Sequence, residues 1–539
     1  MTRHSDPSAV QQTDTSCGAP DRSFAGDFTR RDFARLAAMP VLAAGAAGLL
    51  DAFGSAAASA STSPIVRGGT LRAGLAGGTA SDTLDAHAGV NTVDFARFNQ
   101  LYNALVEYTR DGTLQLMLAE EVVPNATATQ WTIRVRQGVE FHNGRPLGAD
   151  DIIFNFKRIT NKAHPLNGAS ALPPIASLTK LDQRTVRITF ETPYSIFYQV
   201  LAGYFFYIVP VGYDPKKPIG TGPFKYHSFT PGLQSVFLKN PNYWQTGLPY
   251  IDELIMNDYN EETAQVNALI GGQLDAIDQL SAGSLLALKN ANQPTVISNG
   301  GAYAPITMRM DLAPFSDVRV RQALRLLADR PQMRKEVFLG NGLLGNDIFG
   351  IIDPMYDHAI PQRHQDIDQA RSLLKQAGRE NLNVQLVVAP LAQGIVETVE
   401  VFAQQARSAG VTVSVRQVTS TELDGQEFLK WPFAVDTWYG IPYYTNVCLS
   451  QAAKAFDNET HNDIPRYQAL YQSALRTPDI AKQTEIAHEM EMIDYTQGGY
   501  IIPMFTPNID GHSSRLHNVV PGHVGLGFGG YEFKNYWLT

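Results

Sequence analysis

The chain has 539 residues, 44% of them hydrophobic and 18% charged, which excludes an intrinsically disordered protein and suggests about three domain-sized units. Its net charge of −9 offers no basic excess to neutralise phosphates, so we expect no nucleic-acid partner. Its two cysteines, Cys17 and Cys448, exclude a disulfide framework and a zinc site built from several thiolates.

The first 60 residues have the pattern of an export signal. The pair Arg30-Arg31 precedes an apolar run over 36–50, which is too short to span a bilayer core of about 30 Å as a helix. Ala58-Ser59-Ala60 offers the small residues that a signal peptidase needs. Together these features resemble a twin-arginine signal. We expect cleavage near Ala60 and a soluble periplasmic protein, without a lipid anchor because no cysteine follows the apolar run. The alternative is an N-terminal anchor or an ordinary Ala-rich helix.

The first half of the remaining chain favours strands. Period-two alternation predicts strands over 131–136 and 184–190, and a shorter strand is expected over 68–74. Asp150 or Asp151 is expected to cap a helix whose apolar face carries Ile152, Phe156 and Ile159. Further along, a Gly/Pro-rich turn over 219–224 precedes a strand, and a helix runs from about Glu261 to the pair Gly271-Gly272.

The second half has a helix–strand rhythm. A helix is expected after Ser316, with Arg319, Arg321 and Arg325 on its outer face. A second helix opens at Asp366 and stops at Gly378. Strand 383–388, helix 395–408 and strand 411–418 form a predicted βαβ unit with a parallel strand pair, and a long helix over 479–495 precedes a strand over 500–504. This order predicts an α/β fold.

No signature of catalysis is present. The sequence lacks the phosphate loop G-x-x-x-x-G-K-[ST], the zinc motif H-E-x-x-H and the hydrolase elbow G-x-S-x-G. The twelve histidines are scattered, and the carboxylate pairs are neighbours that do not share a helix face. We therefore predict a protein that is not an enzyme, with no catalytic residue, no resident metal and no cofactor.

Two aromatic clusters remain to be explained. Residues 204–207 continue into Ile208-Val209 and are predicted to form a buried strand. Residues 438–444 are interrupted by Gly440 and Pro442 and are predicted to form a loop. Aromatic side chains with polar tips suit small-molecule pockets, because the ring buries apolar ligand surface while the hydroxyl fixes orientation.

Three ordered blocks resemble one known family. Residues 131–144 are similar to the pattern W-T-F-x-L-R-x-G-V-x-F-H-D-G. Residues 220–224 are similar to G-T-G-P-Y, and residues 240–244 are similar to N-P-x-Y-W. Residues 314–323 are similar to P-F-x-D-x-R-V-R-Q-A. These blocks are typical of the extracytoplasmic solute-binding proteins of family 5, the peptide, nickel and opine receptors of ABC importers. Within the blocks we expect Trp131 and Phe141 in the core, and Arg319 and Arg321 on a helix surface.

The resemblance implies a periplasmic-binding-protein-like fold of type II, in the large cluster with an extra subdomain. Its two α/β lobes are joined by a hinge of two crossing strands. On this chain, lobe I is expected over 64–305 and 500–539, with the inserted subdomain near 110–218, and lobe II over 310–498.

The resemblance also points to a ligand loop. Peptide-binding members have a W-x-x-D-Y-x-D-P-type loop whose aspartate pairs with the peptide's amino group. The matching residues 437–446 keep Trp438 and Pro442 but contain no carboxylate, although Asp436 is adjacent. A buried ammonium without a counter-charge is unfavourable, so a neutral or anionic ligand is favoured. The candidate ligand-binding residues are Trp438, Tyr439, Tyr443, Tyr444 and Asn446 of lobe II, Tyr102 and Tyr303 of lobe I and the hinge, and Arg309 for an anionic group.

The expected function is therefore solute capture. A monomeric binding protein would close its lobes around a peptide, opine, sugar or similar solute and deliver it to an inner-membrane ABC permease. Two alternatives stay open. One is a metal or metallophore receptor of the same fold, and the less favoured one is an extracytoplasmic hydrolase.

Overall fold

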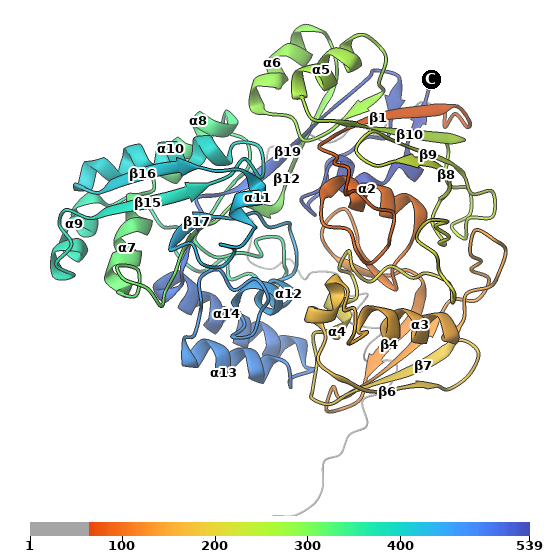
Figure 1. Cartoon of the computed structure of the whole chain (residues 1–539), viewed down its shortest axis with the longest axis horizontal. Helices are drawn as coiled ribbons and strands as arrows, with labels where there is room; N and C mark the ends of the chain where they lie inside the picture. The colour runs from red at the N-terminus through yellow and green to blue at the C-terminus, as the bar shows by residue number, and fades with distance from the viewer. Residues whose placement is uncertain (1–63) are drawn as a thin grey trace, which may run out of the picture. The chain divides into compact units, whose positions relative to one another are not determined.

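The computed structural model describes residues 64–539 (Figure 1). The predicted export signal, with Arg30, Arg31 and the cleavage site near Ala60, lies outside the described residues and stays a prediction. Over residues 64–539, no helix combines the length and the apolar character needed to cross a membrane.

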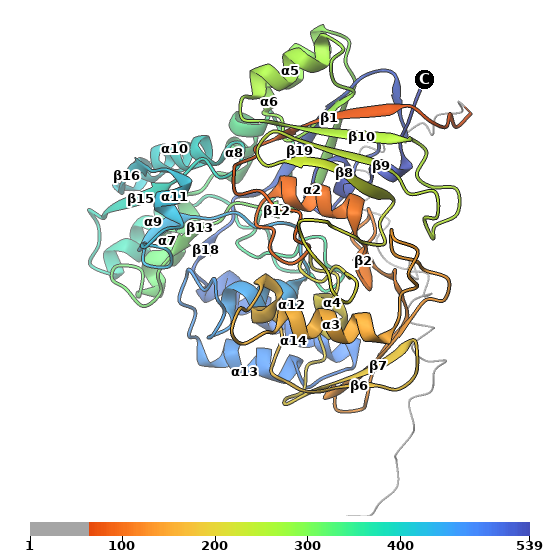
Figure 2. The same ribbon diagram turned by 45° about the vertical axis from the view of Figure 1, so that its right-hand side comes forward.

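An eight-stranded mixed sheet organises the first part of the chain. Its strands run in the order β12-β19-β11-β1-β10-β9-β8, with β14 paired to β19. Strand β1 pairs in parallel with β10 and β11, and the other pairs are antiparallel. Helices α5 (Glu262–Ile270) and α6 (Ala282–Asn290) lie on one side of this sheet, and α2 (Thr92–Leu101) lies on the other (Figures 1 and 2). The strands are β1 (Thr70–Ala76), β8 (Phe224–Thr230), β9 (Gln234–Lys239), β10 (Glu253–Tyr259), β11 (Ala276–Ile277), β12 (Thr295–Tyr303), β14 (Leu343–Leu344) and β19 (Met504–His512).

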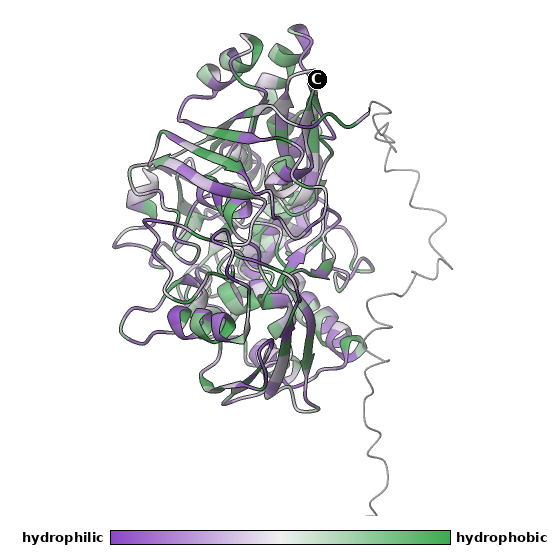
Figure 3. Ribbon diagram, turned by 90° about the vertical axis from the view of Figure 1, so that its right-hand side faces the viewer, coloured by the Kyte–Doolittle hydropathy of each residue, from purple (hydrophilic) through white to green (hydrophobic). Residues whose placement is uncertain are grey.

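A four-stranded antiparallel sheet is inserted between β1 and β8. Its order is β4-β5-β7-β6, and helix α3 (Ala149–Ile159) packs on it. Every second residue of β5 is buried, and Figure 3 shows hydrophobic and hydrophilic residues mixed along these strands, as expected when one face packs and the other meets solvent. Trp131 and Phe141 lie in the core, as predicted. The strands are β4 (Ala119–Pro124), β5 (Gln130–Val135), β6 (Ile175–Lys180) and β7 (Thr185–Phe190).

A five-stranded sheet, in the order β16-β15-β17-β13-β18, organises the second part. Strands β15 (Asn383–Val388) and β16 (Thr412–Gln417) are parallel and joined by α10 (Ile395–Ala406), which confirms the predicted βαβ unit. Helices α8 and α10 lie on one side of the sheet and α7 and α9 on the other (Figures 1 and 2). The remaining elements are β13 (Ile306–Met308), β17 (Phe433–Val435), β18 (Tyr500–Ile501), α7 (Val318–Leu327), α8 (Arg330–Phe338), α9 (Ile367–Gln376), α13 (Pro465–Ala474) and α14 (Ile480–Gln497).

The chain passes between the two large sheets at two neighbouring places. Strand β12 ends at Tyr303 and β13 begins at Ile306, while β18 ends at Ile501 and β19 begins at Met504. Strands β12 and β19 pair with each other in one sheet, and β13 and β18 pair in the other. The chain therefore returns from the five-stranded sheet to the eight-stranded sheet after Ile501, whereas the sequence suggested that lobe I resumes at residue 500.

The family-like blocks over 131–144 and 220–224 contact each other in the structure. The His142 backbone N–H donates to the Gly220 carbonyl oxygen over 2.8 Å, and the Gly220 N–H donates to the His142 Nδ1 atom over 3.2 Å. The turn lies against the end of α2, where a Cβ on Gly220 would be 2.0 Å from the Leu101 carbonyl oxygen and one on Gly222 would be 2.3 Å from that of Gln100. Only glycine fits at these two positions.

The prediction of a buried strand over residues 204–207 is wrong. These residues form turns, and only Tyr207 makes an isolated bridge, to Ala104. The aromatic rings still pack inward from the turns: Tyr204 stacks on Phe95 with ring centroids 4.9 Å apart. Phe206 and Tyr207 are buried and Tyr204 and Phe205 are half-buried, so the apolar run marks a packed segment without specifying a strand.

The expected outer face of α7 is also wrong for two of its arginines. Arg321 is buried and donates to the carbonyl oxygens of Phe315 and Gln497, and Arg325 is fully buried and donates to those of Tyr495 and Tyr500. The physical reason is the end of α14, whose last carbonyl groups have no partner within the helix. The two guanidinium groups supply the missing donors, so this face of α7 packs on α14 rather than facing solvent.

Candidate functional site

The Trp438 loop, residues 436–442, runs from β17 to the short helix α12 (Tyr443–Asn446). It is tied to the crossing between the sheets, because Tyr303 and Trp438 exchange two backbone hydrogen bonds of 2.9 Å each. The backbones approach closely here: a Cβ on Gly440 would lie 3.0 Å from the Gly301 Cα atom. The loop is therefore held at the place where the chain passes from one sheet to the other.

Three predicted site residues form a packed group beneath the loop. Tyr303 stacks on Phe349 at 6.3 Å, and Phe349 stacks on Tyr443 at 5.0 Å between ring centroids. The Asn446 Nδ2 atom donates to the Tyr303 hydroxyl over 2.8 Å. Tyr303, Tyr443 and Asn446 are all buried in this conformation. They support the loop from below rather than present surface to a ligand.

Trp438 and Tyr439 are the members of the predicted set that keep accessible surface. The Tyr439 hydroxyl lies 3.1 Å from the Thr92 Oγ1 atom of α2. Its ring packs edge-on against Phe95 and Tyr204, with centroids 6.0 and 6.4 Å away. Tyr439 therefore joins the loop after the five-stranded sheet to the helix that packs on the eight-stranded sheet.

The other predicted residues are not brought to the loop surface. The Tyr444 hydroxyl donates to the Gln483 carbonyl oxygen in α14 over 2.6 Å. Tyr102 is buried with Phe98, and its hydroxyl donates to the Leu84 carbonyl oxygen over 2.6 Å. Arg309 is largely buried and makes two bonds, of 2.7 and 2.6 Å, to Asp311. That pairing neutralises the guanidinium proposed for an anionic ligand.

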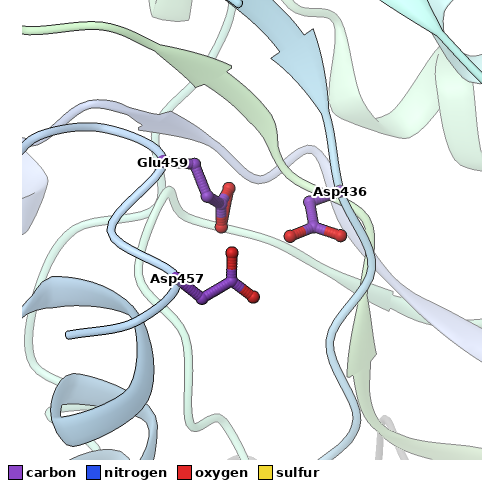
Figure 4. A group of neighbouring side chains, drawn as sticks. All are labelled: Asp436, Asp457 and Glu459. Carbon is purple, nitrogen blue, oxygen red and sulfur yellow. The ribbon is translucent and has the colours of Figure 1, made fainter. Parts of the chain in front are cut away.

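A cluster of three carboxyl groups lies behind Trp438, and the sequence did not reveal it. Asp436, Asp457 and Glu459 each bring one carboxyl oxygen within 4.8 Å of the others (Figure 4). The Glu459 Oε1 atom accepts from the Trp438 Nε1 atom over 3.0 Å and from the Tyr500 hydroxyl over 2.7 Å. The sequence indicates only Asp436, because nothing in the chain shows that the loop over 457–459 returns to it.

The three carboxyl groups of this cluster have no basic partner among the described residues. Burial, followed by the neighbouring carboxyl groups, holds the pKa of Asp436 and of Glu459 well above their usual values. Burial likewise raises the pKa of Asp457 to about 7. Protons or a cation must therefore compensate this group.

A small cavity adjoins the loop on the side of the eight-stranded sheet. It has a volume of about 60 Å³, and Tyr102, Tyr108, Tyr204, Tyr207 and Lys534 are among the residues that line it. Solute pockets usually measure about 300 Å³ or more, so this cavity has room for only a few water molecules. Tyr204, which lines the cavity, also packs against Tyr439.

Comparison with known proteins places the chain in a family. The model of the bacterial extracellular solute-binding proteins, family 5, matches residues 113–458. Di/tripeptide-binding protein 1 of Pseudomonas aeruginosa is 26% identical over 73% of this chain and 81% of that protein. The chain covers 58–61% of the length of several other curated relatives.

Solved structures share the fold. The periplasmic binding protein DppA of Helicobacter pylori, in complex with the peptide STSA, aligns with a TM-score of 0.76 at 20% identity, over 88% of this chain and 98% of that one. NikZ of Campylobacter jejuni, in complex with Ni(L-His), aligns with a TM-score of 0.74 at 18% identity, over 87% and 99%. These likenesses show the two-lobed periplasmic-binding-protein fold. The chain therefore belongs to the bacterial extracellular solute-binding proteins, family 5, the substrate-binding components of ABC importers.

Proposed function

We propose that this protein is exported, captures a peptide-like or other small organic solute at the Trp438 loop, and delivers it to an inner-membrane ABC permease. The observation that carries the proposal is the position of the loop. Its backbone is bonded to Tyr303 at the crossing, and Tyr439 reaches Thr92 on the opposite side. A solute held there touches both lobes.

Contacts between the lobes support a closing movement. The Ser195 backbone N–H, in the inserted region, donates to the Leu475 carbonyl oxygen over 2.9 Å, and the Gln483 Nε2 atom donates to the Ser195 Oγ atom over 2.7 Å. The conformation described here therefore has its lobes in contact. A solute that binds both surfaces stabilises this arrangement over an open one, in proportion to its differential affinity.

The solute class follows from the accessible surface of the loop. Trp438 offers an indole face, and Tyr439 offers a ring with a hydroxyl. Arg309 is paired with Asp311, which weakens the case for an anionic ligand. The relatives named for di- and tripeptides support a peptide-like solute, although position 441 carries isoleucine where the peptide-binding pattern has its aspartate.

A second candidate is a nickel or metallophore receptor. The observation that favours it is the likeness of fold to NikZ, whose structure contains Ni(L-His). Elemental analysis of protein purified without added metal separates the two. Stoichiometric nickel would support the metal receptor, and its absence together with a bound organic molecule would support the first proposal.

The main experiment identifies the cargo. The mature protein is purified without refolding, denatured, and searched by mass spectrometry for a released small molecule. A thermal-shift screen of peptides, opines, sugars and metal chelates follows, because a ligand that binds only the folded state raises the melting midpoint. Turnover of such compounds by the purified protein would contradict the binding-protein assignment and revive a hydrolase.

A further inference from the structure

We propose that Asp436, Asp457 and Glu459 form a binding site for a hard divalent cation of the Ca²⁺ type, located behind the Trp438 loop. This site is distinct from the solute-contacting surface of Trp438 and Tyr439. Figure 4 shows the three carboxyl groups converging from two segments of the chain, the residue after β17 and the loop over 457–459.

The first support is geometric. The three converging oxygen atoms lie within 4.8 Å of one another. Oxygen ligands surround Ca²⁺ at about 2.3–2.6 Å, so two ligands on opposite sides of the ion are about 4.6–5.2 Å apart. Three oxygen atoms within 4.8 Å of one another share a central point that is at most about 2.8 Å from each, so a small adjustment of the side chains brings all three onto one such ion. Carboxylate oxygen atoms are also the ligand type that hard cations prefer.

The second support is an unsatisfied atom inside the cluster. Glu459 is only 8% exposed, and its Oε2 atom has no hydrogen-bond partner. The Asp457 Oδ1 atom is also buried and unpartnered. Buried acceptors without partners are unfavourable, and more so when they are charged. A cation held by the three carboxyl groups would satisfy such an oxygen atom where it faces the cluster.

The third support is the orientation of Glu459. Its other oxygen, Oε1, is fixed by donors from Trp438 and Tyr500. Hydrogen bonds of this kind orient metal ligands in proteins and leave the remaining oxygen free to coordinate. Because one of these donors is the indole of Trp438, an occupied site would hold the side chain that the proposed solute contacts.

The number of carboxyl groups in the cluster favours a divalent cation over an ammonium group as the occupant. Asp424 adds a further negative neighbour to Asp436 and Asp457, and no basic group neutralises the cluster in the described part of the chain. A single positive charge would leave most of the formal charge of the three carboxylates uncompensated. A divalent ion compensates two of the three charges and accepts more oxygen ligands.

The test uses the mature protein after treatment with a chelator and dialysis. Isothermal titration with Ca²⁺ is expected to show one site, and Ca²⁺ is expected to raise the melting midpoint. Affinities of about 10⁻⁴–10⁻³ M are typical of extracellular Ca²⁺ modules, so the titration must reach millimolar concentrations. Tb³⁺ serves as an optical probe, and excitation of Trp438 should sensitise its emission.

Variants decide whether the cluster is the site. Glu459→Gln and Asp457→Asn are each expected to weaken Ca²⁺ binding at least tenfold and to remove most of the Tb³⁺ emission. The control is Asp368→Asn, whose side chain is 94% exposed on α9, and it should bind like the wild type. Asp457→Asn keeps the test valid if Glu459→Gln fails to fold, because Asp457 is less buried.

Three results would overturn the proposal. One is the absence of binding of Ca²⁺, Mg²⁺ and Mn²⁺ at millimolar concentration. Another is binding that the cluster variants leave unchanged. The third is displacement of the ion by simple amines at equal concentration, which would assign the cluster to an ammonium group. Solute binding is measured separately, so a failed cation site leaves the proposed transport function standing, and the reverse also holds.

Discussion

Trp438 connects the two chemical features of the site. Its backbone is bonded to Tyr303, its indole N–H donates to Glu459, and its ring keeps accessible surface. A side chain held at both ends would lose little conformational entropy in the proposed contact with a solute, which would favour tight binding.

Replacing Trp438 by alanine should weaken solute binding at least tenfold while folding survives. The stacking surface is lost, but Glu459 keeps its bond from Tyr500 and the backbone pair with Tyr303 remains possible. Calorimetry with the solute released from the wild-type protein measures the effect, with Trp438→Phe as a milder variant. An unchanged affinity would remove this residue from the binding surface.

Tyr303→Phe should destabilise the protein without touching the accessible surface of the loop. The change removes the only acceptor that the structure gives the Asn446 Nδ2 atom, and both residues are buried. The expected loss is about 1–3 kcal/mol in the free energy of unfolding, measured with urea. Tyr226→Phe, on an exposed position of β8, serves as the control. Equal stability of Tyr303→Phe and wild type would contradict this role.

The sequence predicted a loop over 438–444, which the structure confirms as far as residue 442, whereas Tyr443 and Tyr444 begin helix α12. Trp438 and Tyr439 could be found because aromatic residues interrupted by glycine and proline indicate a loop. The chemistry of Tyr443 and Asn446 suits a binding site, and only their packing against Phe349 and Tyr303 shows that they are buried. Glu459 could not be found at all, since its meeting with Asp436 depends on tertiary contacts.

At the level of helices and strands, sequence patterns predicted structure well where the cause is local, as in capping and in alternation of apolar and polar residues. Asp366 and Asp479 cap α9 and α14, as expected for acceptor side chains at helix starts. The predicted cap of α3 is wrong: Gly148 is its N-cap, and Asp150 and Asp151 lie inside its first turn. Alternation also located β5 and β7.

The wrong predictions for α7 depend on tertiary contacts. The spacing of Arg321 and Arg325 suggests a solvent-facing side of α7, but both side chains donate hydrogen bonds to carbonyl oxygens at the end of α14.

The turn before β8, which lies against the end of α2, offers a test of close packing. Gly222→Ala would place a Cβ 2.3 Å from the Gln100 carbonyl oxygen, and this backbone atom cannot move away easily. We expect a loss of about 1–3 kcal/mol in the free energy of unfolding from the forced backbone shift. Gly283→Ala in α6 meets only the Ser281 hydroxyl at 3.6 Å and should be neutral or stabilising. Similar urea midpoints for the two variants would contradict the account.

Two buried histidines should make the fold sensitive to acid. Burial lowers the pKa of His87 and of His142 to about 4, whereas histidine in an unfolded chain titrates near 6.5. Between pH 6.5 and 4 the unfolded chain binds protons that the folded chain does not, so their contribution to the free energy of unfolding is present above pH 6.5 and is lost as pH falls.

Variants isolate this contribution from the opposite effect of buried carboxyl groups. Asp278, for example, has a pKa raised by burial to about 6, so its contribution grows as pH falls. His87→Gln and His142→Gln should each reduce the loss of stability between pH 7.5 and 4.5, measured by urea unfolding relative to wild type. A loss identical to that of the wild type in both variants would contradict the assignment.

At the scale of the whole molecule, residues of both lobes contribute to the proposed solute-binding surface. The Trp438 loop lies beside the crossing strands, Tyr439 contacts α2, and Ser195 contacts the end of α13 and α14. The family blocks could indicate the two lobes because they occur in order along most of the chain. They could not show the conformation in which the lobes meet, which depends on contacts such as that of Ser195 with Gln483.

The most direct test of the account is a calorimetric titration of solute-free mature protein with the molecule identified by mass spectrometry. The account predicts saturable binding of one solute per chain, with a raised melting midpoint and a smaller radius of gyration in small-angle scattering as the lobes close. The contradicting result is a folded protein that releases no solute and binds none of the peptides, opines, sugars or metal chelates offered.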